Sequence, residues 1–144
     1  MSINYLKLAE DLRDNNINMK IYVIGSSMSP ILRKGNKIYV EPVEISDLSV
    51  GDIVLYRRGE NMVAHRLVGI EQKNNGFIFL TKGDTFSSED EPLREKDIIG
   101  RVYAVEKRGI TLNIRKGLFS VLSRLAYSTS SFTSVLYSIR RWNF

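Results

Sequence analysis

The chain has 144 residues, of which 43% are hydrophobic and 26% charged, and this composition predicts a single globular domain with a core of its own. It contains no cysteine, which excludes disulfides, thiolate nucleophiles and cysteine-bound metals. Its single histidine argues against a zinc site, because catalytic zinc usually takes several imidazole or carboxylate ligands. We therefore expect neither a metal ion nor another cofactor.

The formal net charge of +5 is unevenly distributed along the chain. Residues 1–106 carry 14 basic and 16 acidic groups, whereas residues 107–144 carry 7 basic groups and no acidic group. The basic character belongs to the end of the chain, so no general nucleic-acid-binding surface is expected. The first thirty residues hold no apolar run longer than Ile21–Ile24, and no run reaches the roughly 18 residues of a membrane span. These features predict a cytoplasmic protein that contacts membranes only at their surface.

The predicted elements begin with a helix over residues 2–14, which Ser2 could cap and which carries a rough apolar stripe. Short strands rich in β-branched and aromatic residues then alternate with turns that contain glycine or asparagine. The strands are expected at residues 20–24, 37–42, 53–56, 62–70 and 77–81, before an acidic loop at 83–97 and a last hairpin of 98–106 with 109–114. This mainly β pattern is typical of a barrel or sandwich. We expect three parts, which are a helix at 1–16, a β domain at 17–115 and a tail at 116–144.

Residues 117–144 change character, because two amphipathic stretches separated by Ser128–Ser131 predict helices here. The apolar positions of the two stretches are Leu118, Phe119, Val121, Leu122 and Leu125, and then Phe132, Val135, Leu136, Ile139 and Trp142. Since every charge in this tail is positive, we expect it to dock on an anionic membrane surface. The alternative is that its apolar face packs on the β domain or on a second copy of the chain.

The side-chain types needed for nucleophilic catalysis occur in one order along the chain. Ser27 lies in the turn-like segment Gly25–Pro30, His65 follows on a predicted strand, and Asp84 and Asp90 come next. A serine hydroxyl is a poor nucleophile unless a base takes its proton, and an imidazole oriented by a carboxylate is the usual base. The order favours a serine protease, although each residue alone also fits a structural role in a turn, a core or a cap.

The segments around these residues resemble the sequence boxes of the type I signal peptidase family, in the family order and at compatible spacings. The similar segments are Gly25–Pro30 for the G-x-S-M-x-P box, Leu48–Val54 for the G-D-x-V box, Val63–Val68 for the histidine box of the Ser-His-Asp branch, Leu80–Asp84 with Asp90 for the acid box, and Ile99–Val102 for the closing strand. The resemblance covers roughly residues 20–105. The chain departs from it at Thr85-Phe86, where the family usually has asparagines, and at residues 2–14, where it usually carries a membrane anchor.

The resemblance implies a coiled β barrel-sandwich of the kind shared with self-cleaving repressors of the LexA type. It implies that Ser27 and His65 are catalytic, and by its offset from Gly83-Asp84 it assigns the orienting carboxylate to Asp90, with Asp84 as the alternative. The backbone N–H of Ser27 is the natural oxyanion donor.

The family cleaves an extended segment after small residues, while that segment pairs with strands beside the site. The resemblance therefore implies a peptide or protein precursor as the substrate partner. Met28 and Ile31 are expected to line substrate pockets, and Ile21 and Val23 are expected either there or in the core.

Two other functions fit the same scaffold. A self-cleaving repressor-type protease would use a Ser-Lys pair and a DNA-binding domain, for which the N-terminal segment is too short. A non-catalytic peptide-binding module would require neither Ser27 nor His65. The leading interpretation is a signal-peptidase-like serine endopeptidase.

Overall fold

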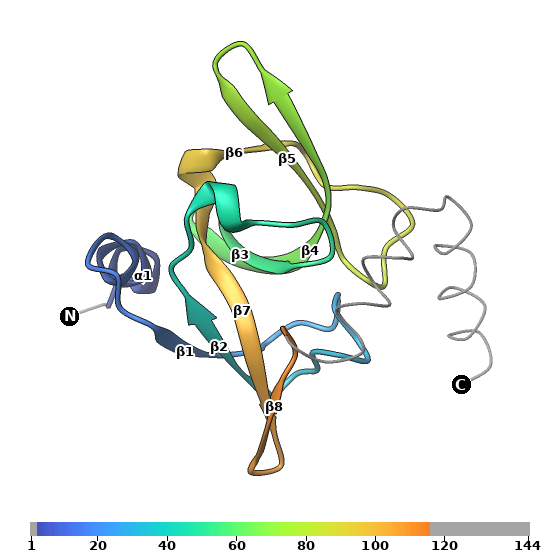
Figure 1. Cartoon of the computed structure of the whole chain (residues 1–144). Helices are drawn as coiled ribbons and strands as arrows, with labels where there is room; N and C mark the ends of the chain where they lie inside the picture. Colours follow the sequence, from blue (N-terminus) through green and yellow to red (C-terminus); the bar gives the residue numbers. More distant parts are fainter. Residues whose placement is uncertain (1–2, 116–144) are drawn as a thin grey trace.

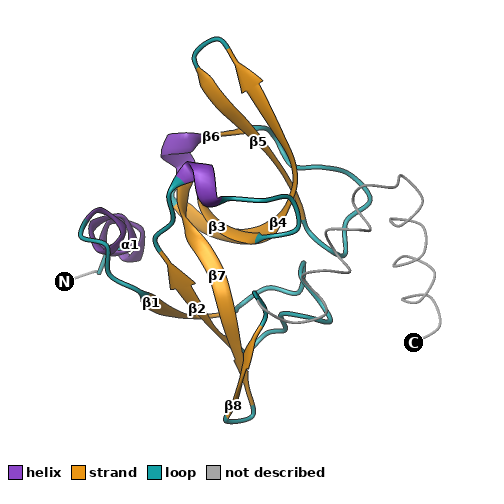
Figure 2. Ribbon diagram, viewed as in Figure 1, coloured by secondary structure: helices purple, strands orange, loops and turns teal. Residues whose placement is uncertain are grey.

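A computed structural model describes residues 3–115, and the predicted tail lies outside the described residues (Figure 1). The elements in chain order are α1 (Tyr5–Asp14), β1 (Met19–Tyr22), β2 (Lys37–Glu41), the 3-10 turn η1 (Ile45–Asp47), β3 (Ile53–Arg58), β4 (Asn61–Lys73), β5 (Gly76–Lys82), β6 (Leu93–Arg94), the 3-10 turn η2 (Glu95–Asp97), β7 (Ile98–Lys107) and β8 (Ile110–Asn113). The strands pair in the order β1-β2-β7-β3-β4-β5-β6, with β8 beside β7, and each pair is antiparallel. The predicted mainly β fold with a short N-terminal helix is confirmed (Figure 2).

Helix α1 begins at Tyr5, three residues later than predicted. Asn4 is its N-cap, because the Asn4 side chain accepts a hydrogen bond of 3.0 Å from the Lys7 backbone N–H. Asparagine caps a helix about as well as the serine that we expected in this role. The inward face of α1 contributes buried Ala9 to the core, with Leu6 packed beside it. The helix thus lies against the β1–β2 end of the sheet (Figure 1).

The acidic segment predicted as a loop contains two short elements, β6 and η2. Leu93 of β6 is buried and lies opposite Phe79 of β5. A strand of two residues shows no alternation in the sequence, so only its pairing with β5 reveals it.

Strand β3 is buried on both faces and separates two hydrophobic cores. Successive side chains of a strand point to opposite faces, so Leu55 enters one core while Val54 and Tyr56 enter the other. The first core consists of Ala9, Met19, Met28, Leu32, Ile38, Val40, Ile53, Leu55, Ile99, Val102 and Val105. The second consists of Leu48, Val54, Tyr56, Leu67, Phe79, Leu93 and Ile98.

The same alternation places His65 and Arg66 on opposite faces of β4. His65 lies across from Val54 in β3 and therefore faces the second core. Thr81 of β5 lies across from Leu67, two residues after His65, so Thr81 shares that face. The strand register thus selects which side chains can meet His65 and which can meet Arg66.

Candidate active site

Ser27 lies in the segment that follows β1, and backbone contacts hold this segment in place. The Val23 N–H donates to the Asn36 carbonyl at 2.8 Å as the chain leaves the strand. The Leu32 N–H donates to the Met28 carbonyl at 2.9 Å, and both of these side chains are buried in the first core. The segment is therefore anchored on each side of Ser27, and it leaves the Ser27 Oγ 3.0 Å from the Nε2 of His65.

The His65 ring is 2% exposed and is held between Ser27 and Asp90. Its Nδ1 lies 2.6 Å from the Asp90 Oδ2. An ionised carboxylate can only accept, so in the neutral imidazole Nδ1 carries the proton that is donated to Asp90. The unprotonated Nε2 then accepts from the Ser27 hydroxyl, which is the direction of proton transfer that a serine nucleophile requires.

Asp90 receives hydrogen bonds at both carboxylate oxygens. The Thr81 hydroxyl donates to Oδ2 at 2.8 Å, and Arg58 lies 3.0 Å from Oδ1. Burial raises the pKa of Asp90, but the hydrogen bonds from His65, Thr81 and Arg58 outweigh it and hold the pKa below its ordinary value. The carboxylate therefore remains ionised at neutral pH and can orient the imidazole.

Tyr56, a residue of the second core, also contacts Asp90. Its side chain is fully buried, and burial raises the pKa of Tyr56 to about 12. The phenol therefore stays protonated and donates a hydrogen bond of 3.1 Å to the Asp90 Oδ2. The Tyr56 oxygen in turn accepts from the Nη2 of Arg58 at 2.8 Å. Tyr56 and Arg58 thus support the carboxylate from the same strand, two residues apart.

Asp84, the alternative acid, meets a different partner. Its two oxygens accept from the Nε and Nη2 of Arg66 at 2.9 Å and 2.8 Å, a bidentate pair with side chains 9% and 7% exposed. The Nη1 of Arg66 also donates to the Gly51 carbonyl at 2.9 Å. The structure thus brings Ser27, His65 and Asp90 together, and it joins Asp84 to the β4 residue that follows His65.

Backbone hydrogen bonds hold the loop after β5 beside the nucleophile. The Thr85 N–H donates to the Ser27 carbonyl at 2.9 Å, and the Asp90 N–H donates to the Thr81 carbonyl at 2.8 Å. A Cβ atom at Gly83 would lie 3.1 Å from the Ser27 carbonyl oxygen and 3.2 Å from the Nε2 of His65. A side chain at this position would therefore crowd both the Ser27 carbonyl and the His65 ring.

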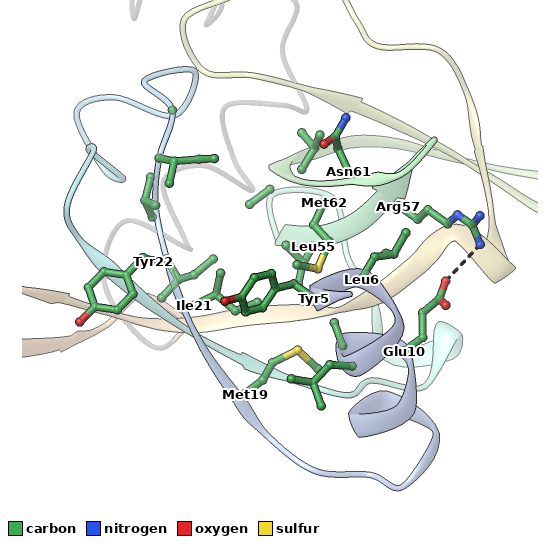
Figure 3. Close-up of a pocket in the computed structure, with 18 of the residues that line it drawn as sticks. Tyr5, Leu6, Glu10, Met19, Ile21, Tyr22, Leu55, Arg57, Asn61 and Met62 are labelled. Atoms are coloured by element: carbon green, nitrogen blue, oxygen red, sulfur yellow. Dashed lines mark hydrogen bonds and ion pairs between the residues drawn. The ribbon is translucent and has the colours of Figure 1, made fainter. Parts of the chain in front are cut away.

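A groove with a volume of about 1230 Å³ runs from Ser27 to α1. It exceeds the roughly 300–1,000 Å³ of ordinary small-molecule sites, so it is large enough for a polymer segment. Its walls are formed by α1, β1, β3 and β4, and the side chains labelled in Figure 3 that line it are mainly apolar. Glu10 of α1 and Arg57 of β3 form an ion pair of 3.2 Å across one end (Figure 3).

The four predicted pocket residues divide between this groove and another cavity. Ile21 and Val23 line the groove, and so does Met28, although Met28 is only 3% exposed and is also a core residue. Ile31 does not line the groove. It borders a second cavity of about 350 Å³ beside Arg66, because the turn after Ser27 directs it away from the site. A substrate-binding role for Ile31 stays a prediction, and the cavity that it borders is not the groove at Ser27.

Sequence reasoning missed four residues around His65, namely Tyr56, Arg58, Thr81 and Phe86. Two of them, Tyr56 and Thr81, could have been found from the predicted hairpins, since pairing of 53–56 with 62–70 and of 62–70 with 77–81 brings those strands beside His65. Arg58 lies beyond the end of the strand predicted at 53–56. The exact register is needed to choose the face, and the sequence alone does not supply it. Phe86 lies in a loop, where no periodicity indicates its position.

Among residues 3–115, which the structure describes, none of the helices has the length and hydropathy that a membrane span requires.

A serine hydroxyl, an imidazole and a carboxylate joined in this order form the arrangement found in serine hydrolases. Comparison with curated proteins adds an independent finding. The chain is 32% identical over 92 residues to a human protein described as a signal peptidase complex catalytic subunit, SEC11B. It is 34% identical over 95 residues to the signal peptidase complex catalytic subunit SEC11 of Colletotrichum graminicola.

These alignments cover 56% and 58% of this chain and 55% of each relative, so the chain spans about half the length of the curated relatives it matches. No family model matches the chain. The similarity to these relatives agrees with the family that the sequence boxes indicated, the type I signal peptidases.

Proposed function

We propose that the chain is a serine endopeptidase in which Ser27 is the nucleophile, His65 the general base and Asp90 the orienting carboxylate. The observation that carries this proposal is the continuous hydrogen-bond chain from the Ser27 Oγ through the two ring nitrogens of His65 to the Asp90 Oδ2, at 3.0 Å and 2.6 Å. Each link has the length that proton transfer or ring orientation needs. Similarity to signal peptidase catalytic subunits supports peptidase chemistry at this site.

The reaction follows from this order of groups. The Ser27 Oγ attacks the scissile carbonyl carbon while its proton passes to the Nε2 of His65, and the ionised Asp90 stabilises the resulting imidazolium without taking its proton. The imidazolium then protonates the leaving amine, the C–N bond breaks, and an ester to Ser27 remains. Water, deprotonated by the same imidazole, attacks the ester, and the acid product leaves as the Ser27 proton returns. The Ser27 backbone N–H is the expected donor to the oxyanion.

The substrate is proposed to lie as an extended strand in the groove that ends at Ser27. The groove is bordered by residues 23–25 on one side and 61–64 on the other, so the backbones of both segments flank its path. An extended peptide can bind between such segments through main-chain hydrogen bonds, which is β-augmentation. The preference for a small residue before the cut rests on the family resemblance, and the apolar lining supports an apolar substrate segment.

The sharpest test uses a fluorophosphonate probe, which labels activated serine hydroxyls, together with hydrolysis of a pool of unstructured peptides. We expect labelling of the native chain and none of Ser27→Ala, and both Ser27→Ala and His65→Ala should lower the cleavage rate by about 10⁴–10⁶. Ser26→Ala is the matched control, because Ser26 is the exposed neighbour of Ser27, and it should keep both signals. Labelling that persists in Ser27→Ala would contradict the proposal.

A non-catalytic peptide-binding module is the second candidate, and the open groove is the observation that favours it. This candidate predicts that native chain and Ser27→Ala bind peptides equally and that neither cuts them. A repressor-type Ser-Lys mechanism is less well supported, since the base within hydrogen-bond distance of Ser27 is His65.

A further inference from the structure

The side chain of Phe86 lies at the mouth of the site and is used by no step described so far. Its ring meets the His65 ring edge to face, with ring centroids 5.7 Å apart and an interplanar angle of 87°. Nearly half of the side chain, 47%, is exposed to solvent. A half-exposed aromatic ring packed on the proposed base presents an apolar surface where a substrate must pass.

The position of Phe86 relative to the reacting atoms follows from Gly83. The point where a Gly83 Cβ would lie is 2.9 Å from the Cδ2 of Phe86, 3.2 Å from the Nε2 of His65 and 3.1 Å from the Ser27 carbonyl oxygen. The distance between the Cδ2 of Phe86 and the Nε2 of His65 can therefore be no greater than the sum of 2.9 Å and 3.2 Å. Phe86 thus lies beside the nitrogen that delivers the proton to the leaving group.

The chemistry of the proposed reaction indicates which part of the substrate lies on the Phe86 side of the site. The imidazolium must come within hydrogen-bond distance of the leaving amine, so the residue that carries this amine passes next to the Nε2 of His65. The large groove borders Ser27 but is lined by neither His65 nor Phe86. The groove therefore suits the segment before the scissile bond, and the surface at Phe86 suits the residue after it.

We propose that Phe86 binds the substrate residue immediately after the scissile bond and favours an apolar side chain there. This inference rests on the proposed endopeptidase function and adds a preference on the leaving-group side. An apolar side chain that covers the ring removes apolar surface of both partners from water, whereas glycine covers little of it and a carboxylate loses hydration there. Because half of the ring is buried already, the gain should be near the lower end of what apolar contacts give enzymes, about tenfold for leucine over glycine.

The test uses the full chain and a mixture of unstructured peptides in which every residue type occurs after many candidate cleavage sites. Products are sequenced by mass spectrometry, and their rates give the preference on each side of the bond. The native chain should cut before leucine about tenfold faster than before glycine or aspartate. Phe86→Ala should bring that ratio close to one while leaving the preference before the bond unchanged.

Two further variants make the result specific. Phe77→Ala removes another partly exposed aromatic side chain, on β5, and should leave both preferences as in the native chain. Phe86→Leu keeps an apolar side chain in the loop and should retain most of the preference, which covers the case in which Phe86→Ala does not fold.

The outcomes separate this inference from the proposed function. If Phe86→Ala slows every cleavage equally and keeps the preference for leucine, Phe86 only supports His65 and the specificity inference is wrong. If the native chain cuts but shows no preference after the bond, the inference also fails while the proposed function stands. If the native chain cuts no peptide and Ser27 is not labelled by a fluorophosphonate, both fail together.

Discussion

Two carboxylates in one loop, Asp84 and Asp90, are buried to a similar extent but are paired with different kinds of basic side chain. Both side chains are less than a tenth exposed. Asp84 is paired with the guanidinium of Arg66, and Asp90 with the imidazole of His65. Because these partners are consecutive residues of β4, strand alternation directs them to opposite faces, and the loop supplies one carboxylate to each.

The difference shows that the partner, rather than burial, decides what a carboxylate can do. A guanidinium is always charged and binds a carboxylate in a rigid bidentate fork, so the Asp84–Arg66 pair can only hold structure. An imidazole gains and loses a proton near neutral pH, so the Asp90–His65 pair can take part in proton transfer. Three substitutions test this contrast.

Asp90→Asn should have the largest effect, and it should act on turnover. An asparagine amide can donate to Nδ1 and so favour the wrong tautomer of His65, which costs serine proteases about 10⁴ in kcat. We expect a loss of this size with a melting temperature close to that of the native chain. Glu89→Gln changes the exposed carboxylate that directly precedes Asp90, and it should keep full activity. The contrast fails if Asp90→Asn retains more than a tenth of native turnover.

Asp84→Asn should act on stability instead. It removes the charge of the carboxylate that pairs with the buried Arg66 guanidinium in a bidentate fork, which costs about 3 kcal/mol, at the lower end for a broken buried pair because the amide oxygen can still accept one hydrogen bond. The melting temperature should fall by about 10 °C for a domain of this size. Glu71→Gln is the control, since its pair with Lys73 is exposed and contributes little. A variant that melts like the native chain but is inactive would reverse the roles of the two aspartates.

Arg58→Gln should have the smallest effect, and acid unfolding should reveal it. Arg58 helps to lower the pKa of Asp90, so its removal should raise that pKa. A carboxyl group with a lowered pKa stabilises the fold above its ordinary pKa, and this contribution is lost as pH falls through the folded-state value. The acid-unfolding midpoint should therefore move to higher pH, and only slightly because Arg58 is 48% exposed and screened by solvent.

Arg57→Gln provides the matched control for this measurement. Arg57 is the neighbouring residue of β3, but it pairs with Glu10 of α1. Its loss should leave the acid midpoint unchanged, and added salt should shrink the difference between the two variants. Equal shifts in both variants would mean that only net charge matters, and the specific contact of Arg58 with Asp90 would then be refuted.

The sequence indicated the strands well because turn residues and alternation are local signals. Boundaries were less well predicted: the strand at 53–56 extends to Arg58 and the one at 62–70 extends to Lys73, both at hairpin ends. The order of serine, histidine and acid indicated the site. What joins Asp90 rather than Asp84 to His65 is the register of β4 with β5 and the path of a loop, and these depend on pairing between distant segments. The environment of Asp90 was therefore beyond local reasoning, as was the turn that carries Ile31 to the second cavity.

Gly83 contributes no group to the chemistry, yet a single methyl group there would meet Phe86, the Ser27 carbonyl and the proposed base at once. The absence of a side chain at Gly83 shapes this site, because it leaves the space that Phe86, Ser27 and His65 occupy. Loss of activity on substitution therefore does not identify a chemical participant. Residues of this kind, which act through the space that they leave to others, are recognised by asking what an added atom would touch.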